Sequence, residues 1–237
     1  FVAACYTNVM STAETILLTK SMVRHGDTLR LNKYPVIDKH SIGGIPGNRT
    51  TLVIVPIIAA AGYYIPKTSS RSITSPAGTA DTMEVLAEVV FPIKKMKEII
   101  LKTNGCIIWG GALNLAPADD KIIAVERPLE IDAESQLLAS IMAKKHSVSS
   151  THILIDIPSG KDAKVKNKIE AARLKKEFEK IGKKLRKHVK VLITDGRQPI
   201  GNGIGPALEA RDVLWLLKRD PRRPIDLEKK CLLMCAE

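Results

Sequence analysis

The spacing of apolar positions switches repeatedly between two patterns along the chain, and this predicts short strands separated by helices. Runs of aliphatic residues predict strands at 36–38, 64–67, 106–109, 153–157 and 189–194. Apolar positions three and four residues apart predict helices at 11–26, 51–61, 79–88, 92–103, 132–145, 165–186 and 206–218. Such alternation is typical of α/β proteins, so we expect a central, mostly parallel sheet flanked by helices.

The longest apolar stretch, Leu52–Ala61, is too short to cross a membrane. It is about half of a bilayer span and is interrupted by Pro56. No segment has the pattern of a signal peptide. The chain opens at Phe1 inside an apolar run, without an initiating Met, and closes at Glu237 just after a helical pattern. We therefore expect no membrane partner, and we expect this sequence to be a piece of a longer protein.

Composition places the chain among globular proteins and excludes a disordered one. Apolar residues make up 45% of the 237 residues and charged residues 26%. Because aromatic residues are only 4%, aliphatic side chains must fill the core. Four cysteines, without metal-binding spacing, are Cys5, Cys106, Cys231 and Cys235. This pattern indicates a reduced, cytoplasmic protein.

The net charge of +12 allows two interpretations. It indicates either an anionic partner or a charged, solvated surface. Much of the excess lies in 161–190, where Leu174, Phe178 and Ile181 form a helical apolar stripe. The lysines that fall mainly outside this stripe are Lys175, Lys176, Lys180, Lys183 and Lys184. This arrangement favours a solvated face, and the scarcity of aromatic residues argues against nucleic acid as a partner.

The segment 38–51 lies between a predicted strand and a predicted helix and has the composition of an anion-binding loop. It contains three glycines, hydroxyl side chains and Lys39. Glycines let the backbone approach a ligand closely, and the following helix offers its N-terminus to an anion. The spacing matches neither a Walker A motif nor a Rossmann fingerprint, so an ordinary glycine-rich turn also explains it.

The segment 67–81 also follows a strand and precedes a helix. Eight of its fifteen residues are Ser, Thr or Gly, and it contains Arg71. Ligands of open α/β sheets bind beyond the carboxyl ends of the strands, so this loop and the loop 38–51 are expected to converge on one anion. A Ser/Thr-rich surface loop is the alternative interpretation.

Four further features are compatible with either a ligand site or ordinary structure. The segment 109–120 is predicted to be a loop that ends in paired acids, Asp119 and Asp120. Ser140 and Lys144 are four residues apart and share one face of a predicted helix. Asp132 stands at the expected start of that helix, where a capping role is the simpler explanation. Glycine-bearing loops at 158–161 and 194–201 are equally well explained as turns.

Several of these motifs together resemble a known enzyme family. The motifs are Lys39-His40-Ser41-x-Gly43-Gly44, Ser69-x-Arg71 and Gly78-Thr79-x-Asp81. They are similar to the signature of the thymidine and pyrimidine-nucleoside phosphorylases. Longer segments, 45–51, 68–71, 109–120 and 205–211, are more similar still to one branch, the archaeal AMP phosphorylases. The resemblance extends over essentially the whole chain.

The resemblance implies both a reaction and a domain organisation. Phosphate would displace adenine from AMP, and also the bases of CMP and UMP, to give ribose 1,5-bisphosphate in nucleotide salvage or degradation. A small helical domain would comprise 1–28 and 118–148, and an α/β phosphate-binding domain 30–117 and 149–237. The family's N-terminal and C-terminal domains would be absent here, and the full-length protein would form a dimer or larger homo-oligomer.

The resemblance also assigns roles to individual residues. It makes Asp132 the proton donor. Phosphate contacts would be Lys39, Ser41, Thr51, Ser69 and Thr79. Nucleotide contacts would be Gly44, Ser70, Arg71, Ser72, Ile73, Thr74, Ser75, Thr79, Ser140 and Lys164. No metal or organic cofactor is implied.

Two departures from the pyrimidine enzymes weaken thymidine as the substrate. Val125 occupies the position of their base-binding arginine, with Arg127 two residues further on. The loop after Gly44 is also one residue longer. A thymidine or pyrimidine-nucleoside phosphorylase nevertheless stays an alternative.

Mechanistically, Lys39 and the loop hydroxyls are expected to position the phosphate nucleophile. Asp132 is expected to protonate the leaving base, and either Lys164 or Arg71 to hold the 5′-phosphate. His40 either contacts the ligand or orders its loop. A Mg²⁺-dependent phosphoribosyltransferase is a further alternative, for which Asp119 and Asp120 are the available acidic pair.

Overall fold

The computed structural model describes residues 1–72, 75–129, 131 and 133–237. Its strands are β1 (Ile37–Ser41), β2 (Ile65–Ser69), β3 (Gly105–Trp109), β4 (His152–Ser159) and β5 (His188–Asp195). Its α-helices are α1 (Val2–Thr7), α2 (Thr12–Arg24), α3 (Thr50–Ala60), α4 (Thr79–Glu84), α5 (Ile93–Thr103), α6 (Pro117–Leu129), α7 (Glu134–Ser147), α8 (Lys168–Lys184), α9 (Pro206–Leu217) and α10 (Ile225–Ala236).

The strands form two parallel sheets that meet side by side. One sheet has the order β1-β4-β5 and the other pairs β2 with β3. A parallel bridge between Val36 and Tyr64 connects them, and the Ile37 N–H donates to the Tyr64 carbonyl over 2.7 Å. The predicted α/β architecture with parallel strands is therefore confirmed.

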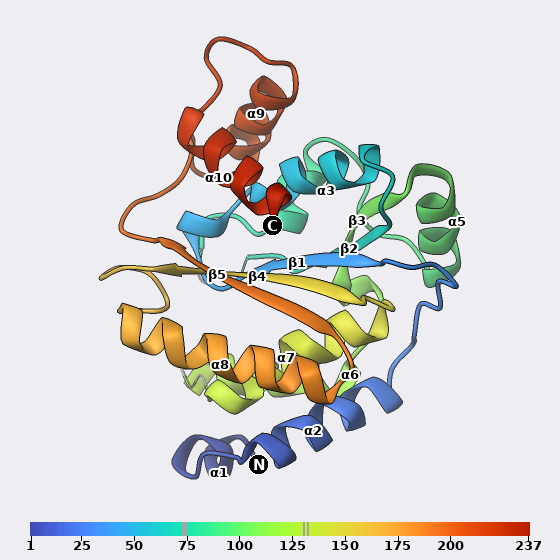
Figure 1. Cartoon of the computed structure of the whole chain (residues 1–237), viewed down its shortest axis with the longest axis vertical. Coiled ribbons are helices and arrows are strands. Elements are labelled where there is room, and N and C mark those ends of the chain that lie inside the picture. The colour runs from blue at the N-terminus through green and yellow to red at the C-terminus, as the bar shows by residue number, and fades with distance from the viewer. Residues whose placement is uncertain (73–74, 130, 132) are drawn as a thin grey trace.

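Helices cover both faces of this layer of strands, as Figure 1 shows. Side chains alternate across β4, so that Ile153 and Ile155 pack with Phe178 of α8 on one face. Leu154 packs on the other face, in the cluster that contains residues of α3, α9 and α10. Burial of one such aliphatic side chain contributes roughly 1.5–3 kcal/mol. The continuous aliphatic runs of the strands are thus explained by burial on both faces.

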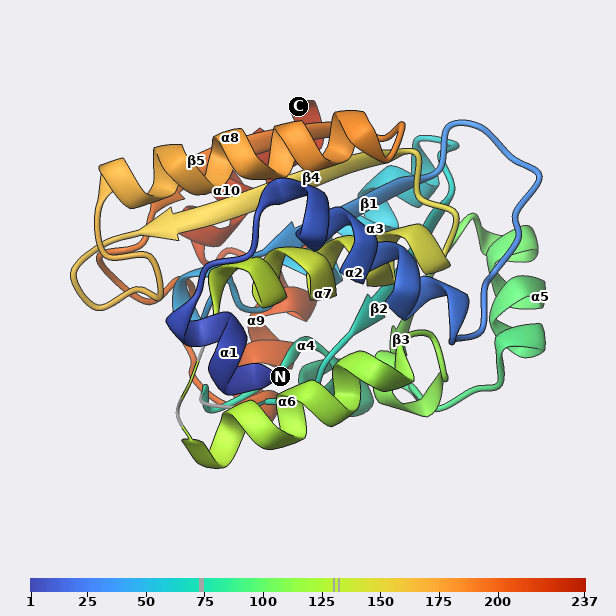
Figure 2. The ribbon, with the colours of Figure 1, turned by 90° about the horizontal axis from the view of Figure 1, so that it is seen from below.

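Four helices pack together on the α8 side of the strands: α1, α2, α6 and α7 (Figure 2). Small residues of α7, Ala139 and Ala143, allow a close approach of Met22 from α2. The predicted capping box is present, because the Ser11 hydroxyl accepts from the Glu14 N–H and the Glu14 carboxylate accepts from the Ser11 N–H. Across the described residues, every helix lacks either the length or the apolar character needed to traverse a bilayer.

The predicted loop 109–120 is wrong in its last part, because helix α6 already begins at Pro117. Asp119 and Asp120 lie in the first turn of this helix. Acidic residues there interact favourably with the helix dipole. Pro128 lies inside the helix near its other end, where a proline disfavours a helical pattern in the sequence. Other boundaries shift by a few residues; α4 ends at Glu84, and α8 begins after its N-cap Asn167.

Candidate functional site

Lys39 is the middle residue of β1, and its side chain is hydrogen-bonded to the start of α3. Its side chain is only 2% exposed. Its ammonium donates to the Thr50 hydroxyl over 2.5 Å, and that hydroxyl donates to the Gly47 carbonyl over 2.7 Å. Burial lowers the pKa of Lys39 to about 8, although nearby Asp156 opposes the shift. Lys39 is therefore a cation that titrates close to physiological pH.

Ser41 ends β1 and connects it to the neighbouring strand β4. Its hydroxyl donates to Asp156 over 2.7 Å. Asp156 is fully buried and also accepts from Thr194 of β5 over 2.5 Å and pairs with Lys230 at 3.2 Å. β1 leads into α3 on one face and β4 into α8 on the other, so the loops diverge here. Such a divergence is the usual ligand position in open α/β sheets.

The glycines after β1 bring a distant lysine to this edge. Gly43 and Gly44 have φ of +81° and +64°. A Cβ on Gly43 would lie 2.4 Å from Cβ of Lys164, which therefore rests against the loop. Lys164 is exposed, and Thr51 is buried in the first turn of α3. The structure thus brings Gly44, Lys164 and Ser41 to one end of the strands.

The second predicted loop starts at the end of β2. Ser69 is 8% exposed, and its buried hydroxyl has no hydrogen-bond partner among the described residues. Asp81 of α4 shapes the loop by accepting from the N–H groups of Ser72 (2.7 Å) and Gly78 (2.9 Å). Thr79 is the first residue of α4, Ser70 is exposed, and the Ser75 hydroxyl donates to the Ala77 carbonyl over 2.9 Å. Ile73, Thr74 and Asp132 lie outside the described residues.

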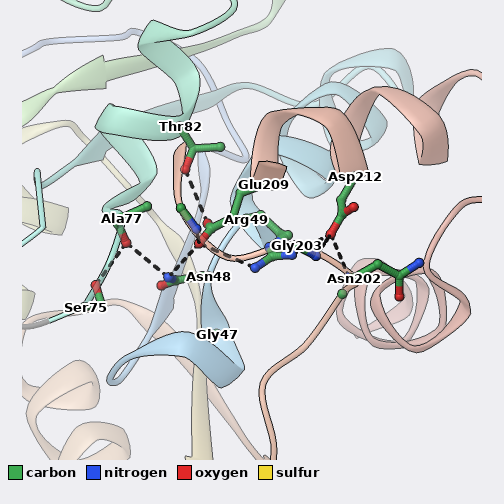
Figure 3. Close-up of polar contacts among 12 residues, drawn as sticks. Gly47, Asn48, Arg49, Ser75, Ala77, Thr82, Asn202, Gly203, Glu209 and Asp212 are labelled. Carbon is green, nitrogen blue, oxygen red and sulfur yellow. Dashed lines mark hydrogen bonds and ion pairs between the residues drawn. The ribbon is translucent and has the colours of Figure 1, made fainter. Parts of the chain in front are cut away.

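The two loops are joined by a direct hydrogen bond. The Asn48 side-chain amide donates to the Ala77 carbonyl over 3.0 Å (Figure 3). The same amide donates to Glu209 of α9 over 3.4 Å, and Glu209 also accepts from Thr82 of α4 over 3.3 Å. Burial raises the pKa of Glu209, in spite of the nearby Arg49. Asn48 and Glu209 therefore hold the loops 38–51 and 67–81 in fixed relation.

Arg49 connects the loop 38–51 to helix α9. It is fully buried, and its left-handed backbone, with φ of 55°, precedes the first turn of α3. Its guanidinium donates to Asp212 of α9 over 2.6 Å, and Asp212 also accepts from the N–H groups of Asn202 and Gly203 (Figure 3). This network was not predicted from the sequence. An arginine beside a glycine-rich loop was the available signal, but the partner of Arg49 lies 163 residues away.

Arg71 is already engaged by two carboxylates. It pairs with Glu84 at 2.5 Å and with Asp81 at 3.1 Å, and its guanidinium stacks over Trp109 with 4.7 Å to the ring centroid. The hydrogen bonds from Arg71 to Glu84 raise the pKa of Arg71. A ligand phosphate that binds Arg71 must therefore compete with Glu84.

The expected pair on α7 is held by an acid from α6. The Ser140 hydroxyl donates to Asp119 over 2.9 Å, and Lys144 pairs with Asp119 at 2.7 Å. Burial raises the pKa of the adjacent Asp120. Because Lys144 neutralises Asp119, these acids do not form a free metal-binding pair. Throughout the described part of the chain, no three His, Cys, Asp or Glu side chains are grouped to hold a metal ion.

A group of buried amines surrounds His40. Burial and the neighbouring Lys145 and Lys67 lower the pKa of His40 well below its usual value, so its ring is neutral at pH 7. Lys145 of α7 pairs with Asp38 of β1 at 3.0 Å. Lys67 of β2 opens the predicted segment 67–81 but was given no role of its own, because a single lysine within a strand gives no distinctive pattern.

Val125 and Arg127, the positions compared with the base-binding arginine of the pyrimidine enzymes, belong to α6. Val125, at the position of the pyrimidine enzymes' arginine, is 48% exposed on α6. The side chain of Arg127 lies outside the part of the chain that the structure describes. A cavity of about 850 Å³ lies at the amino ends of the central strands, where it is lined by Pro35, His152 and His188, and it extends to Asp38 and Lys39 of β1.

A family model and the similar known proteins indicate the same family for this chain. The model described as "Glycosyl transferase family, a/b domain" matches residues 33–211. A "Putative thymidine phosphorylase" of Nitrobacter hamburgensis is 55% identical over 227 residues, covering 96% of this chain and 44% of that protein. A "Putative thymidine phosphorylase 2" of Acidovorax sp. is 50% identical over 237 residues, covering 100% and 46%. The chain thus spans less than half the length of these relatives.

Solved structures show the same fold at low identity. Anthranilate phosphoribosyltransferase from Thermus thermophilus matches with a TM-score of 0.72 and 16% identity, covering 94% of this chain and 73% of that chain. The Saccharomyces cerevisiae enzyme, in complex with PRPP and Mg, gives a TM-score of 0.52 and 16% identity, covering 77% and 47%. At such identity the likeness concerns the fold alone.

Proposed function

Since this chain belongs to the glycosyltransferase family with this a/b domain, we propose that it contributes the phosphate-binding part of an enzyme that cleaves a nucleoside or nucleotide with inorganic phosphate. The observation that carries the proposal is the hydrogen bond between Asn48 and Ala77, which joins the loops after β1 and β2. In this proposal, Lys39 and Ser41 of β1 would bind one phosphate together with Ser69, at the end of β2, and Thr79, at the start of α4. One cation, several hydroxyls and a glycine-containing backbone that a ligand can approach closely form a suitable environment for phosphate.

We propose AMP as the substrate, with adenine and ribose 1,5-bisphosphate as products. The similarity of 68–71 and 205–211 to AMP phosphorylases supports this choice, as does the exposed Val125 where the pyrimidine enzymes have an arginine. Thymidine phosphorolysis is the second candidate, and the names of the relatives favour it. A Mg²⁺-dependent phosphoribosyltransferase has less support, because Asp119 is already paired with Lys144.

In the proposed reaction, a phosphate oxygen bonds to C1′ of the sugar while the bond from C1′ to the base nitrogen breaks. The electron pair of that bond leaves with the base, which takes up a proton. Lys39 and the hydroxyls would orient the nucleophile and offset its charge. Asp132 would supply the proton, a contribution on the order of 10²–10⁴-fold. Ser140 of α7 and Lys164 would contact the nucleotide.

The test is phosphorolysis by the complete encoded protein, with AMP, CMP, UMP and thymidine compared at equal concentration. We expect phosphate-dependent release of adenine and formation of ribose 1,5-bisphosphate, identified by mass spectrometry. Release of thymine with deoxyribose 1-phosphate, and no reaction with AMP, would establish the second candidate. Activity that requires Mg²⁺ and PRPP would refute phosphorolysis.

Replacement of the proposed proton donor provides a sharper check. Asp132→Asn should lower kcat for AMP by at least about 100-fold with little change in AMP affinity, because it removes only the proton transfer. Asp27→Asn, at an exposed position, is the control. Unchanged kcat in Asp132→Asn would remove Asp132 from this role.

A further inference from the structure

Lys67 is a buried amine without a carboxylate partner of its own among the described residues. Its side chain is 5% exposed, and its nitrogen donates to the Thr68 carbonyl over 2.5 Å. The positive charge of the neighbouring Lys145 acts on Lys67, and Lys145 is itself paired with Asp38 at 3.0 Å.

Lys67 lies near the residues proposed to bind phosphate. A parallel bridge between Val36 and Tyr64 joins the two chain segments just before β1 and β2. The charges of Asp38 and Lys39 on β1 both act on Lys67. Beyond the bridge, β1 and β2 belong to separate sheets over the range the structure describes.

The charges around Lys67 are mainly positive. The titratable groups that face it or its neighbour His40 come from β1, β3 and α7: Asp38, Lys39, His40, Cys106, Lys144 and Lys145. Of the acids near them, Asp38 is matched by Lys145 and Asp119 by Lys144. The described part of the cluster therefore lacks a negative charge for Lys67, and an anion that enters would supply it.

Burial and the charge of Lys145 lower the pKa of Lys67 well below its usual value. A buried ammonium without an opposite charge is costly, so the neutral amine is favoured while the site is empty. An oxyanion nearby reverses this balance because it stabilises the ammonium form. The Ser69 hydroxyl, two residues along the same strand and unpartnered within the described chain, provides a second donor for such an anion.

We propose that Lys67 is a proton-accepting anchor for a phosphate oxyanion: it stays neutral in the empty site and takes a proton from solvent when the phosphate binds. This rests on the proposed function and adds a residue that the resemblance did not assign. The phosphate comes either from the inorganic nucleophile or from the 5′-phosphate of a nucleotide, and the experiment separates the two.

Proton uptake can be measured by calorimetric titration of the complete protein at pH 8 in buffers of different ionisation enthalpy. Inorganic phosphate, AMP and adenosine are titrated separately. The variants are Lys67→Met, which keeps the stem without the amine, and Lys67→Arg, which keeps a cation that does not titrate. His40→Gln tests the other neutral base of the cluster, and Lys97→Met, on the exposed face of α5, is the control. Circular dichroism confirms that each variant is folded.

We expect the wild type to take up more protons than Lys67→Met and Lys67→Arg with at least one phosphate ligand, and not with adenosine. Phosphate affinity should fall roughly 10- to 100-fold in Lys67→Met and recover in part in Lys67→Arg. The ligand that shows the difference identifies the source of the phosphate. Should the Met variant be unfolded, Lys67→Arg alone still tests proton uptake.

Two results would overturn the proposal. Equal proton uptake in wild type and Lys67→Arg, or a loss confined to His40→Gln, would show that Lys67 is not the acceptor while phosphate binding itself persists. If the wild type binds neither inorganic phosphate nor AMP and shows no phosphorolysis, the proposed function fails, and the role of Lys67 fails with it.

Discussion

At the scale of single residues, burial determines what the lysines of the site do. Lys39 has a pKa of about 8 because it is nearly inaccessible to water, whereas Lys175 and Lys180 on α8 are 43% and 55% exposed. A cation that titrates near neutral pH can make binding depend on pH. The same residue type therefore has different chemistry according to its surroundings.

The pH dependence of phosphate use should reveal Lys39. Its charged form predominates below about pH 8 and is lost as the pH rises through that value. We therefore expect kcat/KM for phosphate to fall by about tenfold per pH unit above this pKa, because kcat/KM reports the free enzyme. Lys39→Arg should abolish this fall, and Lys97→Met should leave it unchanged. A wild-type profile that stays flat to about pH 10 would contradict the assignment.

Gly43 can be compared with Gly62, because both glycines have positive φ but only Gly43 lies against Lys164. Gly43→Ala imposes positive φ on a side chain and collides with Lys164, whereas Gly62→Ala imposes the same backbone cost in open space. Each should lose about 1 kcal/mol of stability, but Gly43→Ala more. The KM for AMP should rise only in Gly43→Ala, because only there is Lys164 displaced. Steady-state kinetics measures the KM of both variants, and urea unfolding measures their stability. An equal KM for AMP in the two variants would contradict a role of Lys164 in AMP binding.

At the scale of elements, α9 fixes the geometry of both loops although it supplies no predicted ligand contact to the described site. Glu209 reaches Asn48 and Thr82, and Asp212 reaches Arg49. A helix thus acts as a rigid support for loops that contain glycine and are otherwise adaptable. Such support matters because a misplacement of about 1 Å can cost on the order of 100-fold in rate.

Loss of this support should affect both stability and activity. Arg49→Met leaves buried Asp212 and Glu209 without their cation, and we expect the free energy of unfolding to fall by about 3–5 kcal/mol. Arg219→Met is a matched control, because Arg219 also has positive φ (59°) but is exposed. Urea unfolding measures both. A loss below about 1 kcal/mol in Arg49→Met would show that the network contributes little.

At the scale of the whole molecule, the net charge of +12 is distributed between two kinds of surroundings. Buried amines gather near the loops after β1 and β2, and exposed lysines cover α8, whose apolar stripe of Leu174, Phe178 and Ile181 is buried as predicted. The excess positive charge is therefore not one continuous binding surface.

The exposed lysines of α8 should be dispensable for the reaction. The triple variant Lys176→Gln, Lys183→Gln and Lys184→Gln removes three solvated charges. We expect kcat/KM for AMP and phosphate to change by less than about twofold and the melting temperature to change little, because isolated surface charges contribute little to stability. A large, salt-dependent loss of kcat/KM would instead show that this face attracts the substrate.

The sequence predicts the two polar loops of the site but not the residues that hold these loops in place. The loops 38–51 and 67–81 were predicted because their glycines and hydroxyls follow strands directly, which is local information. The roles of Asn48, Arg49 and Lys67 were not predicted. Their partners lie on other elements, and those of Asn48 and Arg49 on α9 are 161 and 163 residues away.

The sequence by itself determined the order of the five strands and of most helices, though not α1 or α6, together with the buried face of α8 and the positions of the two polar loops. Each of these follows from the periodicity of neighbouring residues, which the backbone translates directly into faces and turns. Only the tertiary structure decided which charges are paired and which amines are buried. The pKa of Lys39, the engagement of Arg71 and the isolation of Lys67 depend on how segments distant in sequence pack, because electrostatic energies depend on the surroundings of a group.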